Sequence, residues 1–261
     1  MAKQDRIDIS LAKTPPGVAA TAPTLIVDTY FHIIYDPAEP SGNIPTNKLA
    51  KQLKALNDAY APAKIAFNLK NVTRNANKNW TTFETATDDP LEMQMKAKLR
   101  KGDYKTLNIY FRPWLDRQGD LGFCDFPKTL TSSVMIQDGC SVLSDTVPGG
   151  STGPFNEGKT AVHEVGHWFG LLHTFTGGCS DKDGDMIDDT PAEAEPAFGC
   201  PVGRDSCKKK PGKDPIHNFM DYGDDACLTE FTPGQAVRMR NMWTRFRQQK
   251  LPSSTLDRRS K

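Results

Sequence analysis

The sequence predicts an α+β fold in which a lobe of strands and helices precedes a loop-rich lobe that ends in a helix. Segments rich in β-branched and aromatic residues alternate with segments of helical periodicity in the first half of the chain. Three of the five histidines lie between His163 and His173, and four of the six cysteines follow them. A chain of 261 residues can bury a sizeable core, so we expect one domain with two lobes beside a cleft.

The first lobe is expected to hold a sheet covered by helices. Residues 25–35 (LIVDTYFHIIY) are dense in β-branched and aromatic side chains, which is typical of a central strand. Apolar residues at helical spacing predict helices over residues 46–61 and 90–101. Further strands are expected at residues 65–69, 107–111 and 133–137.

The second lobe is expected to be mostly irregular between His173 and Thr232. A loop region this long needs cross-links, and four cysteines lie in it. The run Thr232-Pro233-Gly234-Gln235 then has the pattern of a capping box with proline at the first helical position. It predicts a final helix whose core face carries Val237, Met239, Met242, Trp243 and Phe246.

The most informative segment is His163-Glu164-Val165-Gly166-His167-Trp168-Phe169-Gly170-Leu171-Leu172-His173, with the pattern H-E-x-x-H-x-x-G-x-x-H. On a helix, positions i and i+4 share a face, so His163 and His167 can bind one metal ion together. Gly170 can adopt a positive φ and turn the chain back, which brings His173 to the site. Three imidazoles suit zinc and leave its fourth position open for water, with Glu164 beside the metal.

The alternative is a buried amphipathic helix whose histidines have structural roles. Three histidines at this spacing, with glutamate second and glycine eighth, are poorly explained by that alternative and favour a metal site. The apolar residues around the ligands predict that the helix is buried, which holds the histidines rigidly. These residues are Val162, Val165, Trp168, Phe169, Leu171 and Leu172.

Charge gives no reason to expect nucleic acid or membrane partners. Lysine and arginine total 33 and aspartate and glutamate total 32. The short basic runs Lys208–Lys210 and Arg258–Arg259 are expected to be solvated surface. No apolar stretch approaches the roughly 18–20 residues of a membrane span.

The six cysteines are expected to form disulfides, which implies an oxidising compartment. Their spacings are not paired C-x-x-C, so a second zinc site built on cysteine is not expected. Two N-x-T sequons, Asn71–Thr73 and Asn79–Thr81, agree with secretion, although the first residues lack the apolar segment of a signal peptide. We therefore expect a secreted, extracellular protein, and the pairing of its cysteines is open at this point.

The histidine pattern resembles that of the metzincin clan of zinc endopeptidases. Metzincins also carry a methionine-containing turn beneath the metal, and Asn218–Tyr222 (NFMDY) looks like that turn. The resemblance covers roughly residues 24–249 and is strongest from 157 to 243, whereas the N-terminal half is similar only in its order of strands and helices. Three further runs are similar to patterns of the pappalysin family, especially its secreted microbial members: Gly184–Pro191, Asp214–Tyr222 and Glu230–Gln235.

The resemblance implies a metzincin-like zinc protease. A twisted mixed β-sheet and the active-site helix would form an N-terminal lobe, and a loop-rich, disulfide-stapled C-terminal lobe would end in a helix. The catalytic domain would span residues 24–249, with the two lobes at 24–173 and 174–249. Residues 1–23 are expected to be a flexible lead-in or a pro-segment remnant, and residues 250–261 are expected to be a tail.

The site residues follow from the same resemblance. Glu164 would be the general base. Tyr222 would stabilise the developing oxyanion through its hydroxyl, although ordinary core packing is an open alternative for this residue. Met220 would form the sulfur-containing floor of the site without binding the metal. One catalytic zinc would be held by His163, His167 and His173.

The resemblance also implies a structural calcium site and two disulfides, and it leaves two further cysteines to pair. Asp185 and Thr190, with the Ile187 carbonyl, would bind the calcium. The loop is not an EF-hand, and a merely solvated acidic loop is an open alternative. The disulfides would join Cys179 to Cys207, Cys200 to Cys227 and, for the two cysteines that then remain, Cys124 to Cys140.

These features together predict a secreted zinc-dependent endopeptidase, a hydrolase in which a zinc-bound water activated by Glu164 attacks the peptide bond. We expect a monomer whose peptide or protein substrate lies along the edge strand predicted at Ser133–Gln137. Asp224 and Asp225 would favour arginine or lysine after the cut if they line the cleft, with solvent exposure as the alternative. The main other function is a catalytically silent, zinc-stapled secreted binding or effector module, and a zinc hydrolase of non-peptide substrates is a further one.

Overall fold

Among the residues that the structure describes, five strands form one mixed sheet in the order β2-β1-β3-β5-β4. Four of them are parallel: β1 (Leu25–Tyr35), β2 (Ile65–Ala76), β3 (Leu107–Arg112) and β5 (Cys140–Leu143). The edge strand β4 (Gly122–Cys124) runs antiparallel to β5, so the predicted mixed sheet is confirmed. The computed structural model describes residues 23–39, 42–82, 89–114, 119–180 and 184–251, and most of the predicted lead-in and tail falls outside these ranges.

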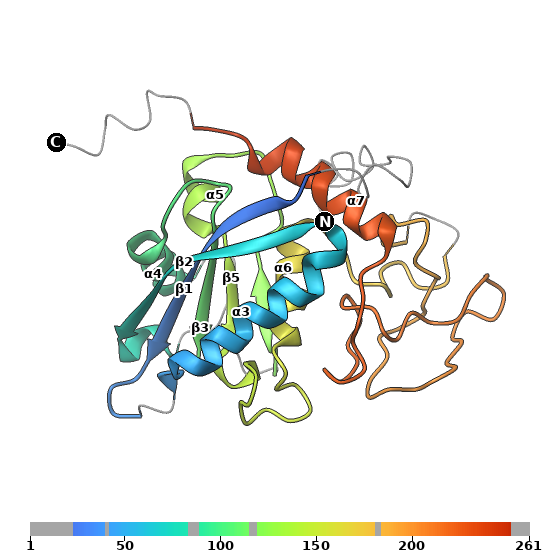
Figure 1. Cartoon of the computed structure of the whole chain (residues 1–261), viewed down its shortest axis with the longest axis horizontal. Coiled ribbons are helices and arrows are strands. Elements are labelled where there is room, and N and C mark those ends of the chain that lie inside the picture. The colour runs from blue at the N-terminus through green and yellow to red at the C-terminus, as the bar shows by residue number, and fades with distance from the viewer. Residues whose placement is uncertain (1–22, 40–41, 83–88, 115–118, 181–183, 252–261) are drawn as a thin grey trace.

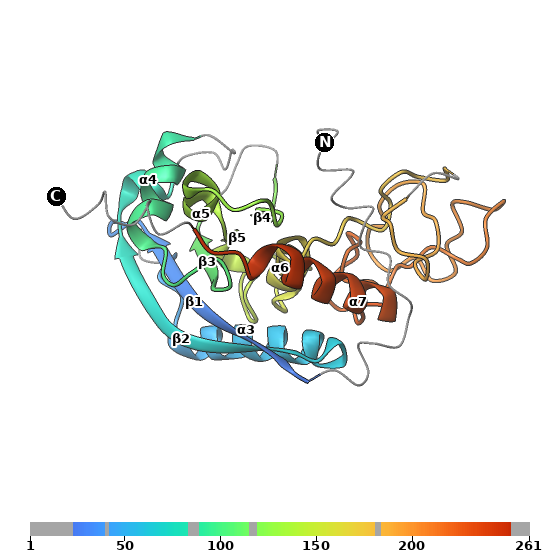
Figure 2. The same ribbon diagram turned by 90° about the horizontal axis from the view of Figure 1, so that it is seen from above.

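Helices cover both faces of the sheet (Figures 1 and 2). On one face, α3 (Thr46–Tyr60) and α6 (Lys159–Trp168) pack against each other, and the Tyr60 hydroxyl donates to the Val162 carbonyl at 2.9 Å. On the other face lies α4 (Pro90–Leu99), with α5 (Ser132–Gln137) beside it. The helix that carries the histidines is therefore supported by both the sheet and a second helix.

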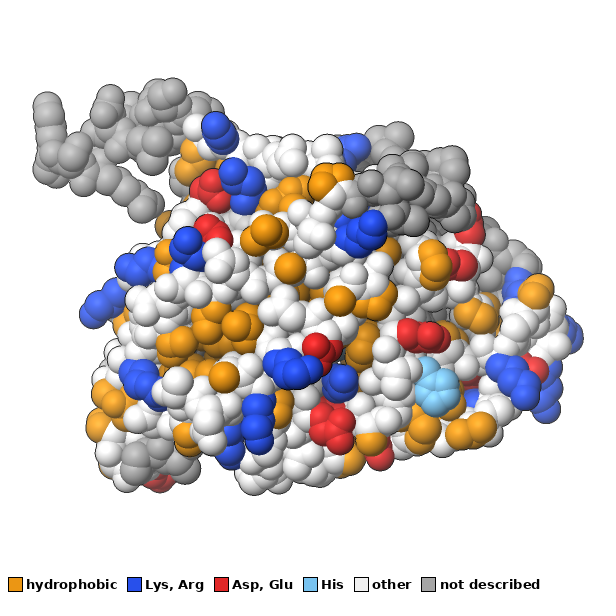
Figure 3. All heavy atoms as spheres, in the orientation of Figure 1, with side chains coloured by type: hydrophobic (Ala, Val, Ile, Leu, Met, Phe, Trp, Pro, Cys, Tyr) orange, Lys and Arg blue, Asp and Glu red, His pale blue; other side chains and the backbone are white. Residues whose placement is uncertain are grey.

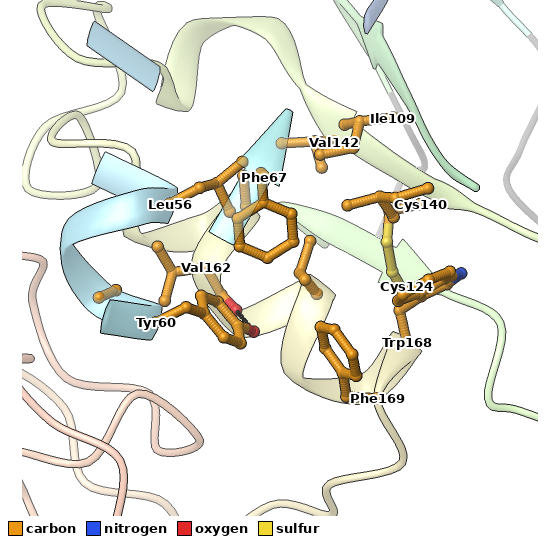
Figure 4. Packing of buried hydrophobic residues seen from close by; sticks show 14 of the residues in the cluster. Leu56, Tyr60, Phe67, Ile109, Cys124, Cys140, Val142, Val162, Trp168 and Phe169 are labelled. Atoms are coloured by element: carbon orange, nitrogen blue, oxygen red, sulfur yellow. Dashed lines mark hydrogen bonds between the residues drawn. A yellow bond between two sulfur atoms is a disulfide. The ribbon is translucent and has the colours of Figure 1, made fainter. Parts of the chain in front are cut away.

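The main hydrophobic core lies between the sheet and the helices α3 and α6 (Figure 4). Alternate residues of β1 enter it, with Val27, Phe31 and Ile33 fully buried. Trp168 and Phe169 at the end of α6 are also fully buried, and the other apolar residues predicted to surround the histidines are buried too. Burial of each such side chain stabilises the fold by ~1.5–3 kcal/mol, so this core anchors α6 firmly.

The strand predicted at Ser133–Gln137 is wrong, because this segment belongs to the short helix α5. The Thr131 side chain accepts a hydrogen bond from Val134 N at 3.1 Å and caps the helix. This local contact outweighs the β-propensity of the segment. The edge of the sheet next to α6 is formed instead by β4.

Strand β2 is longer than predicted, since it continues from Ile65 to Ala76. Its register against β1 shifts at a bulge after Leu69. The bulge moves the following side chains to the opposite faces, which breaks the period-two pattern that marks a strand in a sequence. Strands β4 and β5 have only 3 and 4 residues, too few for a recognisable period.

After His173 the described chain is mostly irregular up to Thr232, as predicted, and forms the orange region at the right of Figure 1. Helix α7 (Pro233–Met242) then begins with the predicted capping box. Thr232 Oγ1 accepts from Gln235 N at 3.1 Å, and Gln235 Oε1 accepts from Thr232 N at 2.9 Å. The five predicted core residues of this last segment are all buried.

The outer surface carries charges of both signs. On the face seen in Figure 3, lysine and arginine side chains are interspersed with aspartate and glutamate, and apolar side chains lie between them. Within the described ranges, no helix has both the length and the apolar character that crossing a bilayer would require.

Candidate metal centre

Helix α6 and the turn after it bring the three histidines together. The helix ends at Trp168, and Gly170 follows with a φ of 89°, as the sequence predicts. A side chain would be strained in this left-handed conformation, whereas glycine adopts it freely. The chain turns back at this glycine and places His173 beside His163 and His167.

The three imidazoles direct the same ring atom toward one point. The Nε2–Nε2 distances are 3.1 Å for His163–His173, 3.1 Å for His163–His167 and 3.0 Å for His167–His173. Tetrahedral ligands at the usual Zn–N distance of ~2.0–2.1 Å are ~3.3 Å apart, so this donor set fits zinc. His163 Nδ1 donates to the Phe219 carbonyl at 2.7 Å, and His167 Nδ1 donates to the Leu171 carbonyl at 2.8 Å. These bonds leave each Nε2 with the lone pair that binding a metal requires.

Burial keeps the three imidazoles neutral. It lowers the pKa of His163 well below its ordinary value, that of His167 to about 4 and that of His173 to about 3. The neighbouring imidazoles lower the pKa of His163 and His173 further. Neutral imidazoles in a protected site are the form that binds divalent transition metals.

Glu164 lies beside the three histidines as a buried carboxyl group. Its Oε2 has no hydrogen-bond partner among the described residues. Burial, with a smaller contribution from the charge of Asp120, raises the pKa of Glu164 to about 8. Gly122 of β4 packs directly against it, since a Cβ at this glycine would lie 2.4 Å from Glu164 Cγ. Sequence reasoning missed both Asp120 and Gly122, because nothing local marks the strand that carries Gly122.

The turn at Asn218–Tyr222 lies beneath the histidines, where the resemblance places a methionine turn. Met220 is fully buried under α6, and a Cβ at Gly166 would lie 2.4 Å from its Sδ. Asn218 Oδ1 accepts from Met220 N at 2.9 Å. Asn218 Nδ2 also donates to Gln235 Oε1 at 2.8 Å, so the turn is tied to the capping box of α7.

Tyr222 lies in the wall of the site. Its hydroxyl oxygen is 3.3 Å from His173 Nε2, and 39% of the residue is exposed. Partial burial and the charge of Glu164 raise the pKa of the hydroxyl, which therefore stays protonated and able to donate near neutral pH. A core-packing role alone does not account for this exposure.

A cavity of about 670 Å³ contains the histidines and is lined from both sides. Gly122, Phe123 and Cys124 of β4 form one wall, and Tyr222 and Phe198 lie in the other. The edge strand that borders the cavity is therefore β4, and the substrate edge expected at Ser133–Gln137 is wrong because that segment is helical.

The two acidic residues after the methionine turn differ in their position. Asp225 lines the cavity and is buried, whereas Asp224 does not line it. The Asp225 carboxylate accepts from Glu157 N at 2.7 Å and from Lys159 N at 3.3 Å, at the start of α6. Burial raises its pKa to about 6.

Buried carboxylates surround Arg204 behind the wall that carries Tyr222. Arg204 Nη1 lies 2.7 Å from Glu193 Oε1 and 3.1 Å from Asp214 Oδ2. Glu193 Oε2 accepts from the Thr174 hydroxyl at 2.9 Å, next to the third histidine. Burial and the charge of Asp221 raise the pKa of Glu193 to about 7. Sequence reasoning missed this cluster, because its members lie far apart in a segment without periodicity.

The residues expected to bind calcium are brought together. Thr190 Oγ1 is 2.8 Å from both carboxylate oxygens of Asp185 and 2.9 Å from the Ile187 carbonyl oxygen. Asp185 is buried, which raises its pKa to about 7. A bound cation would compensate the charge of this carboxylate.

Two disulfides join the cysteine pairs that the resemblance implies, and the third joins the two cysteines that remain. Cys179–Cys207 and Cys200–Cys227 cross-link the irregular region. Cys124–Cys140 joins directly opposed residues of β4 and β5, so it fixes the strand that borders the cavity. His217 lies near Cys200 and Cys227, but a metal site there is excluded while both sulfurs are in a disulfide.

Comparison with known proteins agrees with this geometry. The sequence pattern of peptidase family M43, described as pregnancy-associated plasma protein-A, matches residues 101–244. This chain belongs to the pappalysin family. Pappalysins are metallopeptidases, so the chain is a metalloendopeptidase with a catalytic metal, and the three histidines described above fit a zinc site.

Curated relatives of this pappalysin are extracellular enzymes of fungi. An extracellular metalloprotease of Pyricularia oryzae is 51% identical over 88% of this chain and 79% of its own length. Extracellular metalloprotease 1 of Coccidioides posadasii is 50% identical over 85% of this chain and 78% of its own length. Among solved structures, mature mirolysin of Tannerella forsythia in complex with a cleaved peptide has a TM-score of 0.69 and 26% identity. That match covers 84% of this chain and 91% of mirolysin, and it confirms the predicted metzincin-like fold.

Proposed function

We propose that this pappalysin is a secreted, zinc-dependent endopeptidase whose catalytic domain spans residues 24–249. The observation that carries the proposal is the meeting of three Nε2 atoms within 3.1 Å, beside a buried carboxylate oxygen without a partner. The extracellular relatives and the three disulfides support secretion. We expect the enzyme to act as a monomer on peptides or proteins.

Zinc would be held by His163, His167 and His173, with Met220 packed beneath them. When bound there, Zn²⁺ supplies a Lewis acid that polarises the scissile carbonyl and lowers the pKa of water. The Phe219 and Leu171 carbonyls fix two of the imidazoles in the orientation that the metal needs.

Glu164 would be the general base. Its unpartnered Oε2 can accept a proton from the attacking water and return that proton to the leaving amine nitrogen. The Tyr222 hydroxyl would donate a hydrogen bond to the oxyanion that develops on the carbonyl oxygen, because it faces the cavity beside His173. The substrate would lie extended along β4, whose outer edge borders the cavity, and add one strand to the sheet.

The proposal is tested with Glu164→Gln, which preserves the shape of the side chain and removes the base. We expect kcat on a peptide library to fall by about 10²–10⁴-fold while the protein still binds one equivalent of zinc. Glu195→Gln, at an exposed position, is the matched control and should cleave as the wild type does. Removal of zinc by a chelator should abolish cleavage, and added zinc should restore it.

A variant Glu164→Gln that cleaves peptides at the wild-type rate would overturn the assignment of the base. A wild-type protein that binds zinc but cleaves no peptide would favour the silent binding module instead. Intact Glu164 and Tyr222 in the cavity argue against that module.

We also propose a structural calcium ion at Asp185, Thr190 and the Ile187 carbonyl. The support is the buried cluster of oxygen atoms, which matches the ligand type that calcium prefers. Calcium should raise the melting temperature of the wild type and leave that of Asp185→Asn unchanged. Equal stabilisation of both proteins would contradict this site.

A further inference from the structure

The two edges of the sheet differ in how they are protected. The edge strand β4 is 3 residues long and borders the active-site cavity. The edge strand β2 is 12 residues long, and among the described strands it pairs only with β1 (Figure 2). A long exposed edge strand can pair with other chains, and native proteins usually cover such an edge or interrupt it.

Other segments contact β2 near its two ends. Near its start, the side-chain amide of Asn57 satisfies the outward-facing backbone groups of Phe67. Asn57 Oδ1 accepts from Phe67 N at 2.8 Å, and Asn57 Nδ2 donates to the Phe67 carbonyl at 3.3 Å. Near its end, the Arg74 guanidinium donates to the Ile44 carbonyl at 2.8 Å and holds the loop before α3 against the strand. Residues 68–73 lie between these two contacts.

A glycosylation sequon, Asn71-Val72-Thr73, lies in this middle stretch. Asn71 is exposed, and its Oδ1 accepts from Val72 N at 2.9 Å. A glycan is attached through the other amide atom, Nδ2, so this hydrogen bond can persist in the modified protein. The fold therefore accommodates a glycan at Asn71 without rearrangement.

The sequon threonine indicates when the modification would occur. Thr73 Oγ1 lies 2.8 Å from His32 Nδ1 and accepts from Asn75 Nδ2 at 2.9 Å. A transferase that must contact this hydroxyl would find it engaged in the folded protein. Attachment would therefore precede folding of β2.

We propose that Asn71 is an N-glycosylation site and that its glycan shields the outer edge of β2. The inference rests on the proposed secretion, because glycan transfer takes place in the secretory pathway. The co-reactant is a lipid-diphosphate-linked oligosaccharide. A bond forms between Asn71 Nδ2 and the anomeric carbon, the bond from that carbon to the diphosphate breaks, and the amide proton leaves with the lipid diphosphate.

The position is compatible with catalysis. Strands β2 and β4 lie at opposite ends of the sheet, four strand spacings of ~4.8 Å or roughly 19 Å apart. A glycan on β2 therefore leaves the cleft open to substrate, while its bulk prevents a second chain from reaching the middle of the strand.

The test uses the full chain, directed into the secretory pathway of a yeast host. Peptide mass mapping after enzymatic release of the glycan, which converts the carrying asparagine to aspartate, should locate a glycan at Asn71. The variant Asn71→Gln should lose that glycan, and the matched control Asn79→Gln, in the second sequon, should keep it. A residue-71 peptide without glycan in the wild type would overturn the proposal.

The shielding role is tested by comparing the same secreted proteins in an aggregation assay. Asn71→Gln should aggregate at least ~2-fold faster than the wild type and than Asn79→Gln, because it exposes the strand edge. Equal aggregation rates would overturn the shielding role. Peptidase activity should be unchanged in both variants, so a glycosylated but inactive protein would contradict the proposed enzyme function and leave the glycan site intact.

Discussion

The sheet region before His173 and the loop region after it are held together by different interactions. The sheet region has one large hydrophobic core, in which alternate strand residues pack against α3 and α6. The loop region up to Thr232 has a small apolar cluster of Ala197, Ile216 and Cys227, two disulfides and the buried ion pairs of Arg204. Helices and strands bury apolar faces efficiently. An irregular segment buries less apolar surface, so it needs cross-links and paired charges to be held in one conformation.

The proposed active site lies where these two regions meet. The sheet region supplies the histidines, Glu164 and the strand β4, all fixed by the core. The loop region supplies Met220, which packs into the same hydrophobic core, and Tyr222, whose backbone N donates to Asp221 Oδ1 at 2.8 Å. This division predicts that substitutions in the sheet region and substitutions in the loop region differ in their effects on stability and activity.

The largest effect on stability is expected from the core of the sheet region. Phe169→Ala removes a fully buried ring and should lower the free energy of unfolding by about 3–5 kcal/mol, measured by denaturant titration. The control Phe198→Ala removes a ring that is 69% exposed and should change it by less than about 0.5 kcal/mol. Similar losses for both variants would contradict the assignment of the core to Phe169.

A smaller loss is expected from the cross-links of the loop region. Replacing Cys200 and Cys227 by alanine opens a link across 27 residues and should cost about 3 kcal/mol. Hydrogen exchange should show the loss of protection mainly after His173, while α6 and the strands keep theirs. An equal loss of protection in β1 would mean that the two regions unfold as one unit.

The link between β4 and Glu164, the proposed general base, can be tested at Gly122. A methyl group there would displace Glu164, so Gly122→Ala should lower kcat by about 10²-fold, because small misplacements of catalytic groups have effects of this size. Bound zinc should stay near the wild-type value, since zinc binding does not depend on the carboxylate. An unchanged kcat would show that Glu164 adapts to the methyl group without loss.

The smallest effect is a pH dependence from the loop region. Burial and Asp221 raise the pKa of Glu193 from 4.5 to about 7, so the folded protein holds this proton more tightly than the unfolded chain. The contribution of protonated Glu193 to the free energy of unfolding is fully present below pH 4.5, and it is lost as the pH rises to about 7. The wild type should therefore lose stability between pH 5 and pH 8. The variant Glu193→Gln should lose less free energy of unfolding over the same range, by about 1–2 kcal/mol.

Glu195→Gln is the matched control for this prediction, because Glu195 also faces Arg204 but its side chain is 79% exposed. Its stability should follow the wild-type pH profile. An identical profile for Glu193→Gln and the wild type would show that another group causes the loss.

The cluster of three histidines could be predicted from sequence because its geometry is local. One helix and one glycine fix His163, His167 and His173 relative to each other, and the spacing records this directly. The capping box at Thr232 is local in the same sense. Two of the disulfides followed from the family resemblance, and the third pair was the one that remained.

The features that escaped prediction depend on contacts between distant segments. Gly122 lies against Glu164 only because β4 pairs with β5, and β4 has too few residues for a period. Glu193 and Arg204 form an ion pair in which Glu193 is buried, and no local sequence pattern indicates that burial. The strand predicted at Ser133–Gln137 failed for a local reason instead. The side chain of Thr131 caps this segment as a helix, and the sequence pattern gave more weight to its β-branched residues.

The hydrogen bond from His163 to the Phe219 carbonyl has a thermodynamic consequence. It joins a proposed zinc ligand on α6 to the backbone of the loop region, so His163 is correctly oriented only when the two regions are docked. Zinc affinity and docking of the loop region are therefore linked equilibria, and each must strengthen the other. The zinc affinity measured without substrate would therefore report the equilibrium constant for docking of the loop region on the sheet region.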